Sequence, residues 1–339
     1  MKTLSHENAY QVLLLQLGDE GRDKVLLGDS AARARVAALP FLVGEEFPNV
    51  YLEFPLIGDP FLDVTMLYSN LAPGTRVESE AAADTEALFD WFATIDAKEK
   101  NMSFGFELDT HEPELPRAAI HFQPRAHREF VEPFFRAVGE PERAHLYLDL
   151  AARMPAGWDL SFFGMFRGRK DSPLRVCGYL SGDSQDSCAA DPKKLQEVFD
   201  EIGFTAYDDT MLAQASALMA VRKNNCDFQF DVYPDGSLGD IFAVDAQFQI
   251  EQPQAVRDSF DNGVASRLFG LLEKWGAADS RWRLAAGSAF ARALPIELED
   301  GSAARFSFAL MPQWIKARWR NKVLQPSKLY CLANAKVLT

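Results

Sequence analysis

The chain has few of the residues that build disulfides and metal sites. Only four of its 339 residues are cysteines, and no two of them have CxxC spacing. The five histidines lack the spacing of zinc ligands, and no HExxH motif occurs. We therefore expect reduced thiols and no zinc site built by the protein, as in a cytoplasmic protein.

Motifs for nucleotide and hydrolase chemistry are missing as well. The sequence has no GxxxxGK[ST] loop, no GxGxxG after a strand and no GxSxG turn. Asp208 and Asp209 stand alone and do not form the DDxxD motif with which terpene synthases hold a diphosphate through magnesium. These absences disfavour P-loop, dinucleotide-binding, α/β-hydrolase and terpene synthase chemistry.

Long apolar runs and an excess of positive charge are also absent. No apolar run nears the ~20 residues of a membrane span, and the polar residues within the N-terminal apolar run do not fit a signal peptide. Lys and Arg number 35 against 49 Asp and Glu, which gives a net charge of −14. We expect neither a nucleic acid nor a membrane as partner, although a local pocket can still bind a small anion.

What the sequence does contain is strict alternation of apolar and polar residues. In 226–233, apolar side chains alternate with Gln229, Asp231 and Tyr233, and 244–250 alternates in the same way. Period-2 alternation is typical of a strand with one apolar and one polar face. The Gly-containing segment between the two runs predicts a hairpin turn.

The same unit, a hairpin followed by helical sequence, recurs along the chain. Four further hairpins are predicted at 50–58 with 61–69, 103–109 with 117–123, 158–168 with 174–182, and 304–312 with 327–337. Helical patterns are predicted at 7–20, 29–38, 88–95, 128–139, 141–154, 191–204, 208–221, 255–276 and 279–294. The basic, Trp-bearing segment 312–326 is expected to be a cap or lid.

We predict from this repeat an α+β fold in a single domain over 1–339. N-terminal helices occupy 1–48, and five hairpin-and-helix repeats occupy 49–339. Ten antiparallel strands in sequential order can close into a barrel, which removes exposed edges, while helices cover its apolar outer face. The polar faces then point inward and line a solvated central chamber. Paired strands disfavour a parallel barrel of single strands alternating with helices.

A barrel of ββαα repeats resembles the ABBA or PT-barrel prenyltransferases. Three stretches carry the resemblance: YLEF at 51–54, FGFELDTHEPELPRAAIHFQPR at 104–125, and KLYCLANAK at 328–336. They are most similar to the peptide prenyltransferases of cyanobactin-type pathways. This chain departs from that pattern at Cys331 and Leu332, where the family is richer in tyrosine, and at His121, which replaces a second basic residue.

The resemblance implies transfer of a dimethylallyl or geranyl group from an allylic diphosphate. Glu53, by similarity to the acid of the family's first strand, is expected to be the base or to orient the acceptor. The diphosphate is expected to bind residues of inward parity, whose cations and hydroxyls suit phosphate oxygens and whose rings stabilise an allylic cation. These candidates are Arg117, His121, Arg167, Arg175, Tyr179, Tyr233, Lys328 and Tyr330. Asp63, Asp231 and Asp245 are weaker alternatives for the base or for a magnesium ion.

The acceptor and the cofactor stay open at this point. The resemblance implies an electron-rich side chain of a cyclic ribosomal peptide, with prenyl diphosphate as co-substrate and Mg²⁺ as an optional cofactor. One alternative is a prenyltransferase for tryptophan or another small aromatic molecule. The non-enzymatic alternative is a silent barrel that binds a lipid or a peptide.

Overall fold

The computed structural model describes most of the chain. The described residues are 34, 36–43, 48–97, 100–110, 118–167, 172–222, 226–248, 252–285, 287, 289–297 and 301–338. The helix expected at 7–20 and the candidate residue Arg117 lie outside them. Within the helix expected at 29–38, residues 34 and 36–38 are described and helical. No helix in the described ranges is long and apolar enough to cross a membrane.

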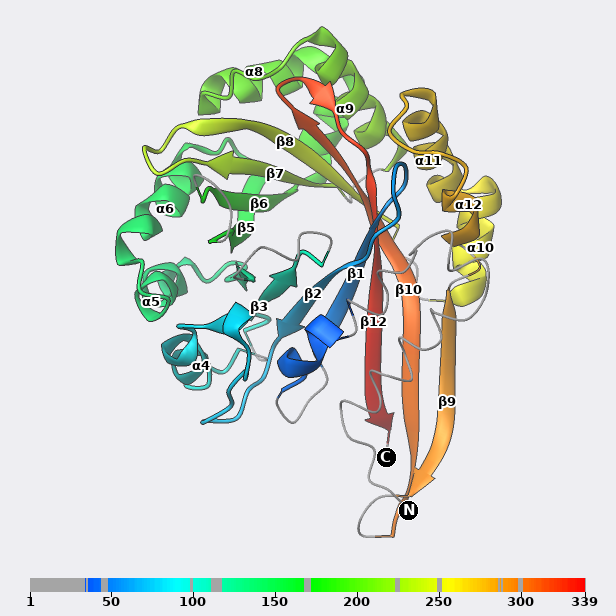
Figure 1. Cartoon of the computed structure of the whole chain (residues 1–339). Helices are drawn as coiled ribbons and strands as arrows, with labels where there is room; N and C mark the ends of the chain where they lie inside the picture. The colour runs from blue at the N-terminus through cyan, green and yellow to red at the C-terminus, as the bar shows by residue number, and fades with distance from the viewer. Residues whose placement is uncertain are drawn as a thin grey trace.

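Ten antiparallel strands close into a barrel in sequence order (Figure 1). They are β1 (Asn49–Pro55), β2 (Asp63–Tyr68), β3 (Ser103–Leu108), β4 (Ala119–Gln123), β5 (Trp158–Met165), β6 (Leu174–Leu180), β7 (Cys226–Val232), β8 (Leu238–Gln247), β10 (Ala303–Arg320) and β12 (Lys328–Leu338). The ring is completed where β10 pairs with β8 and β12 pairs with β1. The predicted ten-stranded antiparallel barrel is therefore confirmed.

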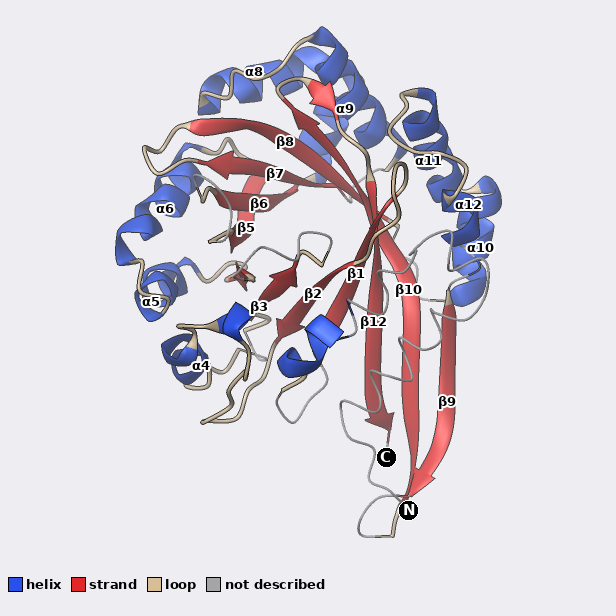
Figure 2. Cartoon of the chain, in the orientation of Figure 1, coloured by secondary structure: helices blue, strands red, loops and turns tan. Residues whose placement is uncertain are grey.

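Helices follow the hairpins and lie on the outside of the barrel (Figure 2). The α-helices are α4 (Glu86–Phe92), α5 (Val131–Ala137), α6 (Ala144–Arg153), α7 (Gly182–Ala190), α8 (Pro192–Ile202), α9 (Asp209–Val221), α10 (Pro253–Asn262), α11 (Val264–Lys274) and α12 (Trp282–Ala285). Short 3₁₀ turns are η1 (Leu39–Phe41), η2 (Glu80–Ala82), η3 (Arg128–Phe130) and η4 (Pro141–Arg143). This arrangement gives two layers, with the apolar core between them.

Aromatic side chains fill the space between the strands and helices. Phe122 of β4 stacks on Phe134 of α5, with ring centroids 4.6 Å apart and planes at 6°. Phe163 of β5 stacks on Phe135 of α5 at 5.0 Å and 8°. All four side chains are fully buried, so the outward-facing parity of the strands supplies the apolar surface that the helices cover.

Two predicted segments have a different structure. The expected cap at 312–326 was wrong, because residues to Arg320 continue β10 and Val323–Leu324 form the short strand β11. The register of β10 with β12 shifts between Pro312 and Trp314, and the strand then continues. The helix expected to reach residue 294 ends at Ala285, and Phe290–Glu297 form strand β9 against β10.

Helix α7 was not predicted from the sequence. It is held in place mainly by polar contacts, which leave no apolar pattern. Ser181 caps it by accepting a hydrogen bond from the backbone N–H of Ser184. The buried side chain of Gln185 donates to the Met219 carbonyl at 3.0 Å and accepts from the Cys226 N–H at 3.1 Å. These bonds tie α7 to α9 and β7 without an apolar stripe that a sequence pattern can detect.

β10 is longer than the barrel needs. Its first half pairs with β9 and with the second half of β12, and together these segments extend beyond the barrel (Figure 1). Its second half pairs with β8 and carries inward-facing side chains. The barrel strand that closes the ring is therefore the segment that had been expected to form a lid.

We expect substitution of Gly105 by alanine to destabilise the barrel severely. An added Cβ on β3 would lie 1.7 Å from the backbone oxygen of Met66 on β2. Because the clash is with backbone, rotation of a side chain cannot relieve it, and the two paired strands would have to move apart. The free energy of unfolding should fall by about 3 kcal/mol or more. Urea denaturation followed by circular dichroism measures it.

Gly270→Ala is the matched control. Gly270 is exposed within α11, and an added Cβ there meets nothing within 4 Å. Because glycine costs a helix interior about 0.5–1 kcal/mol relative to alanine, this variant should be more stable than the wild type. Equal stability of the two variants would contradict the close strand approach at Gly105.

Candidate active site

The barrel encloses a cavity of about 260 Å³ that is lined from all sides by strand side chains. Tyr51 and Glu53 enter it from β1, Cys177 and Tyr179 from β6, and Asp245 from β8. A second cavity of about 30 Å³ adjoins it and shares six of its lining residues. Inward-facing side chains of all ten barrel strands thus meet in one chamber.

The structure brings most of the predicted site residues together. Those that line the larger cavity are Glu53, His121, Arg175, Tyr179 and Tyr330, and Lys328 lines the smaller one. Arg167 and Tyr233 line neither cavity, and both lie beyond the ends of their strands, which are Met165 of β5 and Val232 of β7. Of the weaker alternatives, Asp245 lines the larger cavity, whereas Asp63 and Asp231 are buried in the wall.

Glu53 is held by its neighbours on the adjoining strands. Thr65 Oγ1 donates to its Oε1 at 2.9 Å, and Lys328 Nζ lies 3.4 Å from its Oε2. The same ammonium lies 3.1 Å from Asp63 Oδ2. Burial lowers the pKa of Lys328, but the charges of Glu53 and Asp63 outweigh this and raise it overall. The lysine therefore stays charged inside the barrel.

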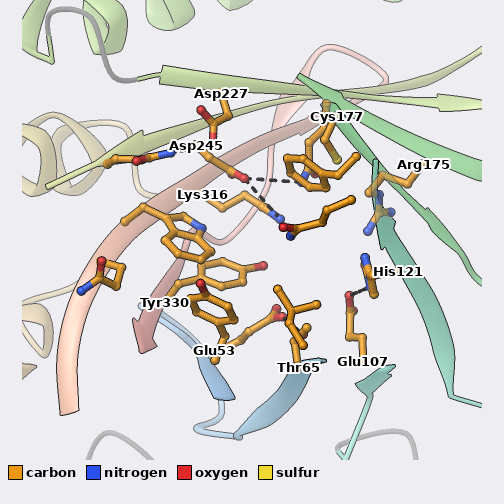
Figure 3. A pocket seen from close by; sticks show the side chains of 18 of the residues that line it. Glu53, Thr65, Glu107, His121, Arg175, Cys177, Asp227, Asp245, Lys316 and Tyr330 are labelled. Carbon is orange, nitrogen blue, oxygen red and sulfur yellow. Dashed lines mark hydrogen bonds and ion pairs between the residues drawn. The ribbon is translucent and has the colours of Figure 1, made fainter. Parts of the chain in front are cut away.

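Arg175 and His121 are also paired with acids. Arg175 Nε donates to Asp231 Oδ1 at 2.9 Å, and its guanidinium lies 4.3 Å from the centre of the Phe166 ring. Burial lowers its pKa, and the Asp231 charge more than restores it. His121 Nε2 lies 2.9 Å from Glu107 Oε2, an interaction visible in Figure 3.

The second half of β10 adds cations that were not among the predicted site residues. Lys316 Nζ lies 3.6 Å from Asp245 Oδ2 and 4.7 Å from the centre of the Tyr330 ring (Figure 3). Arg318 lines the smaller cavity beside it. Lys316 and Arg318 alternate with the buried side chains of Ile315, Ala317 and Trp319, and this strand pattern was available in the sequence.

Three aromatic rings form one wall of the larger cavity. Trp314 stacks on Tyr330 with centroids 4.9 Å apart and planes at 14°, and Tyr51 packs against Trp314 at 4.9 Å. The rings come from β10, β12 and β1, which are neighbours at the closure of the barrel. Burial, with the nearby Glu53 charge, raises the pKa of Tyr330 well above its usual value, so its hydroxyl stays protonated.

Asp227 and Asp245 face each other across β7 and β8. Burial and the neighbouring Asp245 raise the pKa of Asp227 to about 8. Burial raises the pKa of Asp245 to about 6 against the opposing charge of Lys316. Asp227 therefore holds a proton at neutral pH, and its Oδ2 accepts a hydrogen bond from Gln247 at 2.8 Å.

The described side chains do not build a metal site by themselves. No group of three or more His, Cys, Asp or Glu side chains in the described part of the chain is arranged to hold an ion. Asp227 and Asp245 offer at most two carboxylates, and Asp227 is protonated at neutral pH. The described residues therefore do not fit a magnesium ion held by protein side chains alone.

Comparison with known proteins identifies the architecture. No protein-family model and no curated protein matches this sequence. Among solved structures, it is similar to 5-dimethylallyltryptophan synthase from Streptomyces coelicolor, with a TM-score of 0.53 and 12% identity over 97% of each chain. The barrel has the PT-barrel fold.

A second PT-barrel structure agrees with this result. The prenyltransferase PriB in its apo form matches with a TM-score of 0.51 and 12% identity, over 97% of this chain and 96% of that chain. At such low identity the likeness establishes the fold alone. The expected kinship with cyanobactin-type enzymes stays a prediction.

We expect the stability of the protein to depend on pH through Asp227. The pKa of Asp227 is about 8 in the folded protein and near 3.9 in the unfolded chain. Between about pH 3.9 and pH 8, the folded state therefore binds one proton that the unfolded state has lost. Raising the pH from 5 to 8 should therefore destabilise the wild type relative to Asp227→Asn by roughly 3–4 kcal/mol. Urea denaturation at several pH values measures this difference.

Asp235→Asn serves as the control. Asp235 lies exposed in the turn between β7 and β8, and its bonds to Ser237 lower its pKa. It is ionised in both folded and unfolded states above pH 5, so its variant should show no such trend. If the difference in the free energy of unfolding between the wild type and Asp227→Asn did not change from pH 5 to pH 8, Asp227 would be ionised in the folded protein over this range.

Proposed function

We propose that this protein is a prenyltransferase that moves a dimethylallyl or geranyl group from an allylic diphosphate to an electron-rich side chain. The observation that carries this proposal is the composition of the two joined cavities. One end is lined by cations, and an aromatic wall stands beside it. An anionic leaving group and an allylic cation need these two environments next to each other.

The diphosphate is assigned to the smaller cavity and the adjoining part of the larger one. The smaller cavity is lined by four cationic residues, Arg175, Lys316, Arg318 and Lys328, and by two acids, Glu53 and Glu107. Burial lowers the pKa of both Lys328 and Arg175, but the acids Glu53 and Asp63 beside Lys328 and Asp231 beside Arg175 raise it, so both cations stay charged inside the barrel. Tyr330 lines both cavities and can donate its hydroxyl to a phosphate oxygen.

The prenyl group then lies against Tyr51, Trp314 and Tyr330. As the C1–O bond breaks, its electron pair leaves with the diphosphate, and the electron-rich rings stabilise the positive charge on the allyl group. The acceptor ring forms a bond to C1 and afterwards loses a proton. Glu53 is assigned the role of accepting that proton or of holding the acceptor in place, by its similarity to the family's first-strand acid.

Two acceptors are compatible with this chemistry. The resemblance to cyanobactin-type enzymes supports a side chain of a cyclic ribosomal peptide. The cavity volume of about 260 Å³ supports a single aromatic ring beside a short donor, whether the ring belongs to a peptide or to a free molecule. Magnesium, where it takes part, would be bound mainly by the diphosphate oxygens.

Binding of the donor is expected to require Lys316. We propose isothermal titration with the non-hydrolysable thiolodiphosphate analogues of dimethylallyl and geranyl donors, with and without Mg²⁺. The wild type should bind one of them with micromolar affinity. Lys316→Gln should weaken binding about tenfold or more, because a buried charge-assisted contact to the diphosphate is lost.

Lys322→Gln is the matched control in the same hairpin. Lys322 is exposed in the turn after β10, so its removal changes the net charge equally without touching the chamber. The affinity of Lys322→Gln for the donor analogue should stay within about threefold of the wild-type value, since exposed charges contribute little to binding. Absence of binding by well-folded wild-type protein would support the silent barrel instead.

Turnover is expected to depend on Glu53. Glu53→Gln keeps the size of the side chain and a hydrogen-bond acceptor for Thr65, but it removes the basic carboxylate. The turnover number should fall about 100-fold or more, and the donor affinity should change little. Steady-state kinetics with a prenyl acceptor, beside donor titration, separates the two effects.

Glu129→Gln is the control for this variant, because Glu129 is exposed outside the barrel and should leave turnover unchanged. Unchanged turnover in Glu53→Gln would remove the assigned role of Glu53. Loss of donor affinity together with turnover would show that Glu53 acts by holding Lys328 in place.

A further inference from the structure

We propose that Lys316 and Asp245 form an exchangeable ion pair. The diphosphate of the donor takes Lys316 from Asp245, and Asp245 takes up a proton from the solvent in place of the lost cation. Donor binding is then coupled to proton uptake, and release of the diphosphate restores the pair and returns the proton. This inference rests on the proposed function, since it concerns the binding of the donor.

Lys316 and Asp245 form the loosest ion pair of the chamber. Lys316 Nζ lies 3.6 Å from Asp245 Oδ2, whereas the other ion pairs among the described chamber residues are 2.9–3.4 Å long. In the described part of the chain, Asp245 is also the one acid with which Lys316 forms an ion pair. An ammonium group with a single and distant counter-charge is the easiest to transfer to a new anion.

Lys316 lies where the two cavities meet. Its side chain lines both of them, and its Nζ lies 4.7 Å from the centre of the Tyr330 ring, which also lines both. Asp245 lines the larger cavity and is not part of the lining of the smaller one, and Figure 3 shows its contact with Lys316. A diphosphate in the smaller cavity therefore competes with Asp245 for the same ammonium group.

The diphosphate is the stronger competitor for this ammonium group. It carries several negative charges and several acceptor oxygens, whereas Asp245 carries one charge, and the attraction between charges grows with their product. Three further cations that line the smaller cavity, Arg175, Arg318 and Lys328, hold the diphosphate within reach of Lys316. The exchange forms and breaks ionic contacts only, and no covalent bond of the protein changes.

Asp245 has little support for a negative charge once Lys316 is engaged elsewhere. The residue is 4% exposed, and Gln229 Nε2 donates to its Oδ2 over a long distance of 3.4 Å. Its buried Oδ1 has no hydrogen-bond partner among the described residues. An ionised carboxylate in such a place is costly, and a nearby diphosphate adds to the cost. Oδ1 is therefore a suitable position for a proton.

The surroundings of Asp245 leave it as the group beside Lys316 that can take this proton. Burial raises the pKa of Asp245 to about 6 against the charge of Lys316, and the charge of Glu53 adds to the rise. Asp227 already holds a proton at pH 7, and burial keeps the pKa of Cys177 and of Tyr330 well above neutral pH. The charged and titratable groups that face Asp245 are Lys316 of β10, Asp227 of β7, Arg175 and Cys177 of β6, Glu53 of β1 and Tyr330 of β12.

The size and direction of the coupling follow from the pKa of Asp245. With a pKa of about 6, the carboxyl is about nine-tenths ionised at pH 7, so donor binding should take up as much as about 0.9 proton. Because the donor complex favours the protonated acid, this coupling weakens donor binding as the pH rises above 6. Between about pH 6 and 7.5 the affinity should fall about tenfold through Asp245.

The test is isothermal titration at pH 7 in PIPES and in Tris buffer, which differ in their enthalpy of ionisation. The ligands are the thiolodiphosphate analogues of the dimethylallyl and geranyl donors and inorganic pyrophosphate, all without Mg²⁺. The dependence of the binding enthalpy on the buffer gives the number of protons taken up. Ionisation of the ligand itself contributes equally to all proteins, so the wild type is compared with Asp245→Asn. The wild type should take up about 0.5–0.9 proton more per ligand.

The affinity of Asp245→Asn distinguishes exchange from a structural role. Because asparagine does not compete for Lys316, the variant should bind the donor analogue about tenfold more tightly than the wild type at about pH 7.5, and within about threefold at pH 6. If Asp245 only positioned Lys316, its replacement would weaken binding at both pH values. Lys316→Gln should lose the extra proton uptake together with affinity, since Asp245 then has no cation to give up.

Two variants serve as controls for the source of the proton uptake. Asp235, exposed in the turn between β7 and β8, is ionised at pH 7 with or without a donor, since its bonds to Ser237 lower its pKa. Asp227 already holds its proton at pH 7. Asp235→Asn and Asp227→Asn should therefore retain most of the wild-type uptake. Thermal unfolding of each variant checks that it is folded.

The outcomes separate this inference from the proposed function. Equal proton uptake by the wild type and Asp245→Asn, or weaker donor binding by folded Asp245→Asn at about pH 7.5, would overturn the exchange. If that variant does not fold, undiminished uptake by Lys316→Gln would overturn it instead. Binding of pyrophosphate with the expected uptake, but of neither prenyl analogue, would remove prenyl transfer and leave the exchange standing. Failure of all three ligands to bind the folded wild type would remove both.

Discussion

The seam between β8 and β10 is the interaction on which the rest of the structure depends. Residues 314–320 pair with residues 241–247 and join the last barrel strand to the eighth. Without this seam, both strands would expose unpaired backbone groups, and the chamber would be open to solvent along its length. The seam also places Lys316 opposite Asp245, so backbone closure and charge pairing occur at the same place.

Closure has an electrostatic consequence. Ten strands of alternating polarity put their polar faces into one small volume, where charges are poorly solvated and interact strongly. Most of them are stabilised in acid–base pairs, as Arg175 is by Asp231. Asp227 is accommodated differently, by retaining its proton. The charges that line the chamber are thus largely compensated within the protein, and a ligand binds by replacing or completing these interactions.

Much of this architecture could be predicted because strand parity has a period of two. Alternation alone located the hairpins and put Glu53, Arg175 and Tyr330 on the inner face. The same reasoning failed where parity was continued past a strand end, as at Arg167 and Tyr233. It also failed in 312–326, where a proline and an expected short strand hid the continuation of β10, and with it two of the chamber's cations.

The sequence could not have identified which charged residues are compensated. Parity assigns a side chain to a face, but pairing depends on distances of a few ångströms between strands that are remote in the sequence. Arg125 shows the difference, because it lies after the last residue of β4 and would ordinarily be assigned to a turn. Its backbone is left-handed and its side chain lines the chamber, where its guanidinium donates to the Tyr179 hydroxyl and to Gln123 Oε1. Which charges of such a barrel compensate one another is therefore decided by contacts between strands that form only when the ring is closed.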